Sequence, residues 1–177
     1  MTNKQLDCEE YAKAANAFYP HQFNANEWVE AIKSAGMKGA VITAKHHDGF
    51  CMFDTQTTEY NSVDMVAGGR DFVRELSDAC ARHGLNFGLY FSLIDWHYPY
   101  AYPISSHNAD FVTPEHHEYS KVQVRELLTG YGPIYTWFWD IPPKIEDPSL
   151  NKLVRQLQPG IYINNRGWDA GDFSTPE

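Results

Sequence analysis

Cysteine is scarce in this sequence, and its spacing argues against cross-linking or zinc binding. The 177 residues contain three cysteines, Cys8, Cys51 and Cys80, which lie far apart and form no CxxC pair. A disulfide framework requires an even number of regularly spaced cysteines, and a structural zinc site usually contains paired ones. The sequence therefore does not fit a small disulfide-stabilised scaffold, and it gives no sign of a zinc site.

Basic clusters and long apolar segments are also missing. The chain has 14 Lys and Arg against 23 Asp and Glu, a formal net charge of −9, and no block of basic residues. We therefore expect no nucleic-acid partner. Met1 is followed by polar and charged residues, without the apolar core of a signal peptide, and no stretch is apolar enough to cross a bilayer. We expect no membrane partner. The compartment stays open, and a secreted, periplasmic or lysosomal location would suit the full-length protein.

Glycine-rich phosphate-binding motifs are absent as well, although helix and strand patterns alternate along the chain. Helical patterns cover about 24–35, 71–83, 113–130 and 148–157, and strand patterns cover about 39–45, 86–92, 133–140 and 161–166. Such alternation predicts parallel strands with helices outside them. A doubly wound sheet or a (β/α) barrel would satisfy this order. Polar residues follow all four strands, and no GxGxxG motif follows any of them, which favours the barrel.

What the sequence does contain is a dense group of titratable residues after the first predicted strand. The apolar run Val41–Thr43 leads into Lys45-His46-His47-Asp48-Gly49-Phe50. Parallel α/β folds place ligand chemistry at the carboxyl ends of their strands. The alternative is a polar turn with no function. Two long polar loops, about 48–69 and 93–112, follow the first two strands, and loops of this length usually carry function.

Asp140 is the most informative single residue. It ends a run, 135–139, that is so apolar that the carboxylate must lie at the rim of the core. A carboxylate in that position is paired, protonated or poised to react, unless it only caps the turn before Pro142 and Pro143. Other predicted strand ends carry Tyr90, with Asp95 and Trp96 beyond it, and Asn164-Asn165-Arg166.

Two carboxyl groups that flank one bond are what glycoside hydrolysis requires. The candidates for a second carboxylate are Asp48, Asp95, Asp172 and Glu177, which we expect in loops at the rim. Arg166 and the paired histidines would donate hydrogen bonds to hydroxyl groups, and tryptophans such as Trp96 would stack on sugar rings. Aromatic residues make up 15% of the chain, which suits such a site.

Metal binding is the competing use of His46, His47 and Asp48. Adjacent strand residues point to opposite faces, and no HExxH motif or facial triad spacing is present, so we expect no metal. His116 and His117 fall in the first turn of a predicted helix, where we expect solvent-exposed residues.

Segments spread over nearly the whole chain from about residue 20 resemble one known family. They are FNANEW (23–28), AGMK (35–38), TAKHHDGF (43–50), FGLYFS (87–92), VRELL (124–128), YGP (131–133), WFWD (137–140) and GDFSTPE (171–177). The sequence resembles the catalytic domain of the α-L-fucosidases, glycoside hydrolase family 29. KHHDGF in a strand–loop context is a highly specific part of this match.

The resemblance implies a retaining, cofactor-free hydrolase that acts on terminal α-linked L-fucose of oligosaccharides or glycoconjugates. Asp140 matches the nucleophile. Glu177 matches the acid/base of part of the family, whose position varies among members. The residues that match contacts to sugar hydroxyls are His46, His47, Tyr90 and Arg166. One departure is the stiff Ile141-Pro142-Pro143 segment, because the family usually has a small or flexible residue after the nucleophile.

The resemblance also implies that the catalytic barrel is incomplete. An earlier strand with a sugar-binding histidine and a Glu-Trp pair, both usual in the family, are not found, and four predicted strands are half of the eight in a (β/α)8 TIM barrel. We therefore expect residues 1–177 to form about four β/α units, without the N- and C-terminal parts of the domain. In such a fragment Phe87, Leu89, Trp137 and Phe138 would be partly exposed, unless a homo-oligomer covered the open edges.

Two other functions stay open on the sequence. One is a catalytically silent carbohydrate-binding fragment that keeps the histidines and Arg166. The other is a sugar isomerase or metal-dependent hydrolase on a similar barrel, which would need metal ligands that the sequence does not offer.

Overall fold

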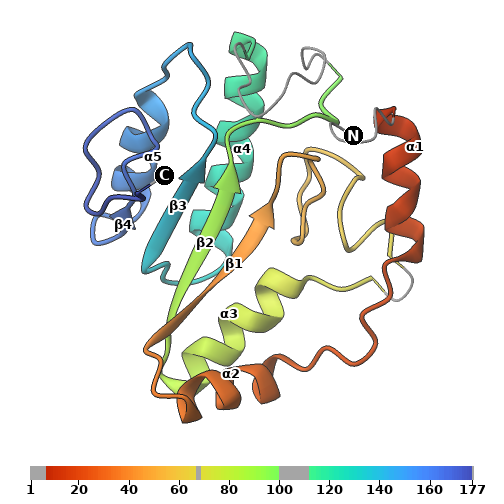
Figure 1. Ribbon diagram of the computed structural model, residues 1–177, viewed down its shortest axis with the longest axis vertical. Helices are drawn as coiled ribbons and strands as arrows, with labels where there is room; N and C mark the ends of the chain where they lie inside the picture. The colour runs from red at the N-terminus through yellow and green to blue at the C-terminus, as the bar shows by residue number, and fades with distance from the viewer. Residues whose placement is uncertain (1–6, 67–68, 100–111, 177) are drawn as a thin grey trace.

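The chain forms a parallel four-stranded sheet with helices in the crossovers between the strands. The structure is a computed structural model that describes residues 7–66, 69–99 and 112–176. The strand order is β1-β2-β3-β4, and all three pairings are parallel. The strands are β1 (Gly39–Lys45), β2 (Asn86–Ser92), β3 (Thr136–Asp140) and β4 (Tyr162–Ile163). The helices are α1 (Cys8–Ala12), the 3-10 helix η2 (Lys13–Ala17), α2 (Ala25–Ser34), α3 (Phe72–His83), α4 (Pro114–Gly130) and α5 (Ser149–Leu157) (Figure 1).

Helix boundaries follow from capping residues. The side chain of Asn24 accepts hydrogen bonds from the N–H groups of Asn26 and Glu27, which starts α2. Thr113 accepts from the N–H of His116 at the start of α4. Gly84 ends α3 with a φ of 68°, in the left-handed region that glycine adopts without strain. These caps confirm the predicted starts of α2 and α4 and the predicted end of α3.

The two faces of the sheet have different environments. On one face Leu89, Phe91, Trp137 and Trp139 are fully buried in a single cluster with residues of α2, α3, α4 and α5. The expectation that Phe87, Leu89 and Trp137 would be partly exposed is wrong. Alternate strand residues point to opposite faces, and these three point toward the helices.

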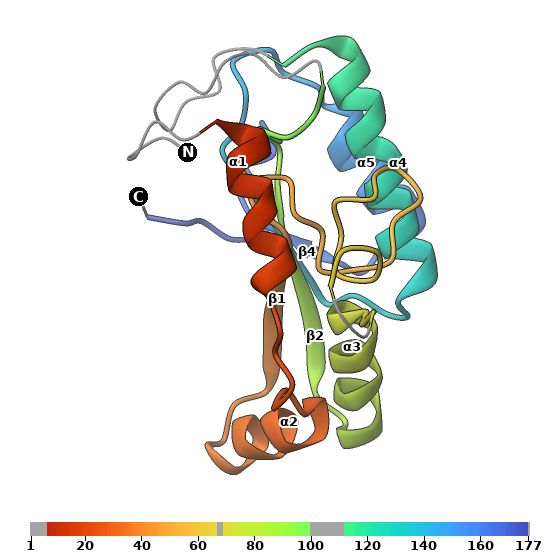
Figure 2. The same cartoon turned by 90° about the vertical axis from the view of Figure 1, so that its right-hand side faces the viewer.

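The opposite face of the sheet is open. Val41 on β1 is 54% exposed, and Tyr90 on β2 and Phe138 on β3, which point to the same face, are only partly buried. Figure 2 shows α3, α4 and α5 together on one side of β1 and β2. A doubly wound sheet would carry helices on both faces, whereas a (β/α) barrel carries them only outside. The arrangement is therefore that of part of a barrel.

β3 and β4 are shorter than the sequence patterns predicted. Pro133 lacks an N–H, and the N–H of Ile134 donates to the side chain of Gln158 rather than to a strand. At β4, the side chain of Asn164 accepts from the N–H of Trp139 at 2.9 Å and donates to its carbonyl at 2.9 Å. The amide of Asn164 thus replaces a backbone pair of the ladder, so the strand ends at Ile163.

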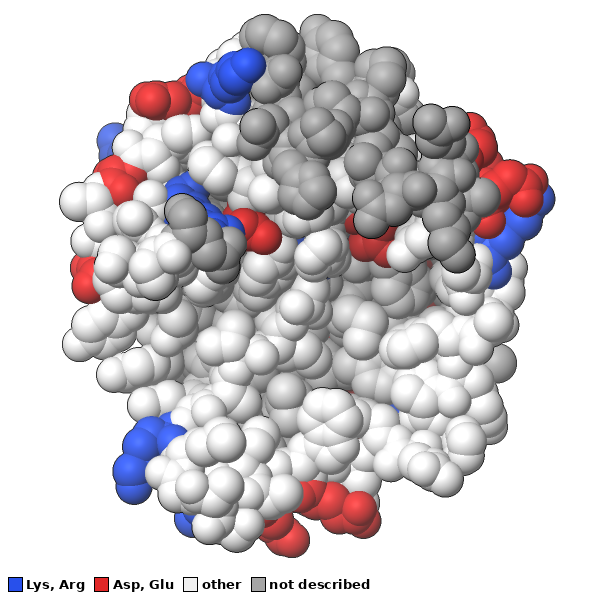
Figure 3. Space-filling model, in the orientation of Figure 1, with Lys and Arg blue, Asp and Glu red and all other residues white. Residues whose placement is uncertain are grey.

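The open face is mostly uncharged. Figure 3, in the orientation of Figure 1, shows it as a hollowed area with few acidic or basic side chains, which lie above it and at its margins. No helix among the described residues is long and apolar enough to span a membrane.

Candidate active site

β3 ends with Asp140 on the open face of the sheet, where three hydrogen-bond donors surround its carboxylate. Ser92 of β2 is the register partner of Asp140, and Tyr90 lies two residues earlier on the same face. The Tyr90 hydroxyl donates to Oδ2 of Asp140 at 2.5 Å, and the Ile141 N–H donates to Oδ1 at 2.9 Å. Arg166, which lies beyond β4, forms an ion pair with Oδ1. Strands adjacent in the sheet thus converge on one carboxylate.

The ionisation of Asp140 results from opposing effects. Burial alone would raise its pKa, because a low-dielectric environment disfavours the charged form. The hydrogen bonds from Tyr90, the Ile141 N–H and Arg166, together with the charge of Arg166, outweigh burial and hold the pKa below its ordinary value. Asp140 is therefore an ionised carboxylate near neutral pH.

His47 is held in one tautomer by a residue that the sequence reasoning missed. Its Nδ1 lies 2.7 Å from the Oγ of Ser92, and the Ser92 hydroxyl donates to the carbonyl of Ile94 at 2.9 Å. A hydroxyl has one proton, so Ser92 must accept from His47, and Nδ1 carries a proton. Nε2 of His47 faces the site, 3.8 Å from Oδ2 of Asp140. The alternation of Tyr90 and Ser92 on β2 was the signal for Ser92.

His46 and Trp96 complete the cluster. The centre of the His46 ring lies 3.9 Å from the centre of the His47 ring. The His46 ring also stacks on the Tyr90 ring, with 5.6 Å between the ring centres and 8° between the planes. The backbone N–H of Trp96 donates to the carbonyl of His47 at 2.8 Å. The Trp96 ring contacts the His47 ring edge-on, with 5.5 Å between the ring centres. The structure therefore brings together six of the seven predicted site residues. Glu177, the seventh, lies outside the described residues.

Comparison with known proteins decides the family. The family model for α-L-fucosidases matches residues 2–177. This chain belongs to the α-L-fucosidase family. A putative α-L-fucosidase from Caenorhabditis elegans is 37% identical over 134 residues, which cover 73% of this chain and 27% of that protein. α-L-Fucosidase 1 from Arabidopsis thaliana is 37% identical over 163 residues, covering 87% of this chain and 30% of that protein.

Solved structures of the family share the fold. α-L-Fucosidase isoenzyme 1 from Paenibacillus thiaminolyticus superimposes with a TM-score of 0.86 at 35% identity, covering 98% of this chain and 47% of that one. Unliganded α-L-fucosidase AlfC from Lactobacillus casei gives a TM-score of 0.80 at 33% identity, covering 92% and 56%. These matches confirm the predicted fold class, part of a TIM barrel. The chain spans about half the length of these structures and less than a third of these curated relatives.

Two other candidate carboxylates of this fucosidase-family chain, Asp95 and Asp172, form their contacts with residues other than Asp140 and its donors. Asp95 lies in the loop after β2, as predicted, but it is buried, 3.6 Å from the Nζ of Lys45, and accepts two backbone N–H groups. Asp172 binds Arg155 at 2.7 Å and accepts the Ile163 N–H at 2.8 Å. Burial raises the pKa of Asp48, and the nearby His46 opposes that shift.

The remaining histidine pair was assigned to the wrong environment. His116 and His117 are buried at the start of α4, rather than exposed to solvent. Burial, with smaller effects of Lys45 and His117, lowers the pKa of His116 to about 3, so it is neutral. The described part of the chain contains no cluster of three or more His, Cys, Asp or Glu that could hold a metal ion.

An open cavity borders this site at the exposed edge of β1. Its volume is about 880 Å³, and His46 and Asp48 are among the residues that line it. Most of the lining is apolar and includes Phe18, Phe23 and Val41. A cavity with mostly apolar walls and a few polar groups suits a small organic ligand.

Proposed function

We propose that this chain carries the nucleophile and the sugar-binding half of a retaining α-L-fucosidase, which releases terminal α-linked L-fucose from oligosaccharides or glycoconjugates. The observation that carries the proposal is the ionised Asp140 carboxylate, held by Tyr90 and Arg166 beside His47 in a chain of this family. Mutants of AlfC have been solved with Fucα(1,6)GlcNAc and with 4-nitrophenyl α-L-fucopyranoside as substrate, which supports this substrate class.

In the first chemical step, an oxygen of Asp140 forms a bond to the anomeric carbon of fucose. The bond from that carbon to the leaving oxygen breaks, and the leaving oxygen receives a proton from a general acid. In the second step, water that has lost its proton to the same residue displaces Asp140. A trapped covalent intermediate is described for a Bacteroides thetaiotaomicron fucosidase that is 25% identical to this chain, which supports the retaining course.

Glu177 is the proposed general acid and base. Retention requires the two carboxyl groups to approach to about 5–5.5 Å. The negative charge of Asp140 would raise the pKa of a carboxyl group at that distance and so keep it protonated for the first step. The mechanism requires no cofactor and no metal ion.

The remaining site residues would hold the sugar. His47 presents Nε2 to the site, where this nitrogen can hydrogen-bond to a sugar hydroxyl between it and Asp140. Arg166 has five N–H donors, so it can orient Asp140 and still bind a hydroxyl. His46 and Tyr90 would contribute further hydroxyl contacts, and Trp96 would supply an apolar wall.

We also infer that residues 1–177 are one incomplete barrel domain, completed by segments outside this sequence. Four strands with one open face support this, since a closed barrel has eight. A catalytically silent carbohydrate-binding fragment is the alternative, and turnover separates the two functions.

The test is Asp140→Gly, assayed with 4-nitrophenyl α-L-fucopyranoside in the protein that carries this chain. We expect kcat to fall by about three to six powers of ten and azide to restore part of it, because azide fits the space left by the carboxylate. Asp78→Ala, at an exposed carboxylate on α3, is the matched control and should keep wild-type turnover. Near-normal turnover of Asp140→Gly would exclude Asp140 as the nucleophile.

A further inference from the structure

A lysine without an assigned role lies directly beneath the histidine pair. Lys45, the residue before His46, is 0% exposed, and its Nζ donates no hydrogen bond to any of the described residues. The Nζ lies 4.3 Å from the centre of the Phe91 ring and 3.6 Å from Oδ2 of Asp95, which is also buried. The pair therefore occupies the layer between the sheet and α4, away from the sugar face.

A buried ion pair of this kind contributes little to stability. The cost of removing both charges from water offsets their attraction, and two apolar side chains in the same space are often at least as stable. The pair is therefore better explained by its effect on the positions of the neighbouring loops than by a contribution to the stability of the fold.

Asp95 organises the loop after β2. Its Oδ1 accepts the N–H groups of His97 at 2.9 Å and Tyr98 at 3.0 Å, which closes a turn around Trp96. The backbone N–H of Trp96 in turn donates to the carbonyl of His47 at 2.8 Å. Asp95 thus sets the orientation of the residue that contacts His47.

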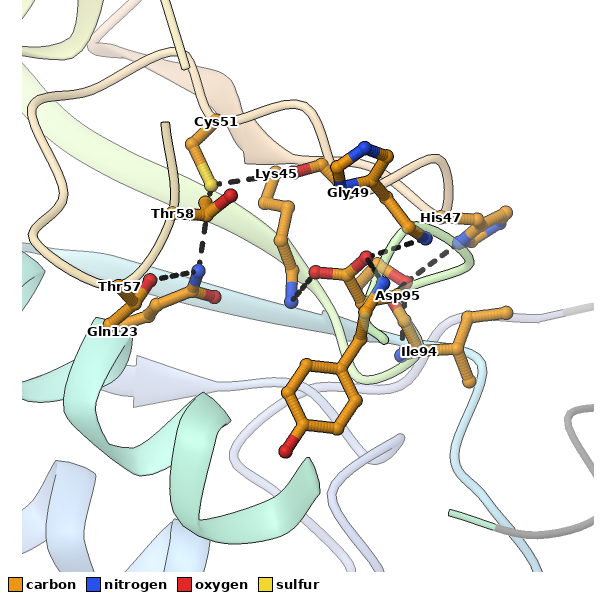
Figure 4. A network of polar contacts seen from close by, with 12 residues as sticks. Lys45, His47, Gly49, Cys51, Thr57, Thr58, Ile94, Asp95 and Gln123 are labelled. Carbon is orange, nitrogen blue, oxygen red and sulfur yellow. Dashed lines mark hydrogen bonds and ion pairs between the residues drawn. The ribbon is translucent and has the colours of Figure 1, made fainter. Parts of the chain in front are cut away.

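Asp95 also packs directly on the loop after β1. Gly49 has a φ of +85°, and a Cβ atom at that position would lie 2.1 Å from Oδ1 of Asp95. Only glycine leaves room for the carboxylate, which therefore touches the backbone of the loop that carries His46 and His47. Figure 4 shows Lys45 and Asp95 pointing toward each other between these two loops.

The far side of the β1 loop is anchored independently. Gln123 of α4 donates from Nε2 to the Oγ1 of Thr57 at 2.8 Å and lies 3.6 Å from the Sγ of Cys51. The β1 loop is therefore fixed to α4 at residues 51–57, while the Lys45–Asp95 pair joins it to the β2 loop at the site.

We propose that Lys45 and Asp95 are a positioning pair, which fixes the loop bearing His46 and His47 against the loop bearing Trp96 so that these side chains meet the sugar together. The pair touches no substrate. The inference rests on the proposed function for its kinetic effect, whereas its structural effect can be measured without turnover.

The test compares Lys45→Met with Lys45→Met/Asp95→Asn in the protein that carries this chain. The single variant leaves a buried carboxylate without its cation and should lower the melting temperature. The double variant removes both charges, and the amide oxygen can still accept the two N–H groups, so the melting temperature should return close to the wild-type value. We expect its kcat/KM on 4-nitrophenyl α-L-fucopyranoside to stay about 10- to 100-fold low, mostly through KM, because the sugar contacts are misplaced. Recovery of kcat/KM together with stability would overturn the proposal.

A second readout does not need turnover. The wild-type protein should give a nuclear Overhauser effect between the Trp96 indole and the His47 ring, and the double variant should lose it; its persistence would also overturn the proposal. If the wild-type protein has no fucosidase activity, the proposed function fails, but this signal still decides the role of the pair. Asp95→Asn alone provides the same comparison if the lysine variants do not fold. The control, Lys121→Met/Glu118→Gln, removes an ion pair on α4, outside both loops, and it should leave KM unchanged.

Discussion

At the scale of single residues, Asp140 is a buried carboxylate that its hydrogen-bond donors keep charged. Burial works against its charge, and three donors restore it. Because the pKa is lower in the folded protein than the ordinary value of 3.8, this carboxylate contributes to the free energy of unfolding above about pH 4, and the contribution is lost as the pH falls through the folded-state value.

Tyr90 is the donor whose removal tests this balance. Tyr90→Phe keeps the ring stack with Phe138 but removes the hydroxyl that donates to Asp140. We expect the pKa of Asp140 to rise, so the acid limb of the pH dependence of kcat/KM should move to higher pH. Tyr162→Phe, at an exposed tyrosine on β4, serves as the control. An acid limb at the same pH in Tyr90→Phe would contradict the assigned role of the hydroxyl.

Ser92 should control the tautomer of His47. In Ser92→Ala the Nδ1–H of His47 loses its acceptor, so the ring can turn or exchange tautomers. We expect KM to rise by about 2- to 10-fold, which is the value of one hydrogen bond. Ser77→Ala also removes a buried hydroxyl, on α3, which donates to the Tyr131 carbonyl at 2.7 Å. Equal effects of both variants on KM would show that Ser92 has no specific role.

Sequence reasoning found the residues whose chemistry is unusual for their place, and it missed those that support them. Asp140 after an aromatic strand and the histidines after β1 stood out, and the structure brings them together. Ser92 contacts His47, and Lys45 contacts Asp95, between segments that are about 45–50 residues apart. The alternation on β2 indicates the face on which Ser92 lies, but no local pattern indicates either partner. His116 and His117 were misplaced for the same reason, because burial is set by what packs on α4.

At the scale of elements, the segment after β3 is strained. Ile141 has a φ of +48°, a region that a β-branched residue rarely adopts, and its N–H donates to Oδ1 of Asp140. Trp168 donates from Nε1 to the Pro143 carbonyl at 2.9 Å and so fixes the same segment. Strain of this kind costs about 1–3 kcal/mol and is typical of functional sites.

Relief of this strain should separate stability from activity. Ile141→Gly is expected to raise the free energy of unfolding by about 1 kcal/mol, because glycine adopts this φ freely. The backbone N–H remains in Ile141→Gly and should still donate to Asp140, so kcat should stay close to the wild-type value. Ile141→Ala keeps a Cβ atom and most of the strain, so it should gain less stability in urea unfolding. A Gly variant that is less stable than the wild-type protein would contradict this account.

Element types and order were predictable because caps and apolar periodicity are local. Asn24, Thr113 and Gly84 mark helix ends that the structure confirms. The ends of the strands were not predictable, because they depend on partners across the sheet. Asn164 illustrates this: its side chain takes over the pairing with Trp139 and shortens β4.

At the scale of the whole molecule, the sheet is a barrel segment with its interior face open. Parallel order and outside helices were predicted from the alternation of elements. The burial of Leu89 and Trp137 was not, since only the packed structure shows which face the helices cover.

The open face has a consequence for the polypeptide of residues 1–177. Parallel sheets are stable when both faces are covered, and exposed Val41 lies on a face that is not. We expect this polypeptide to associate in a concentration-dependent way in sedimentation velocity experiments, with weak near-UV circular dichroism. A monomer at all concentrations with sharp aromatic signals would contradict this expectation.

The central claim is that Asp140 forms the bond to fucose, and one measurement tests it most directly. The protein that carries this chain is incubated with 2-fluoro-fucosyl fluoride, digested and mapped by mass spectrometry. The fluorine at C2 slows breakdown of the intermediate, so the account predicts a fluorofucosyl group on the peptide that contains Asp140, with fragmentation that locates it on that carboxylate. A label on another residue, or turnover of fucosides without any label, would contradict the claim.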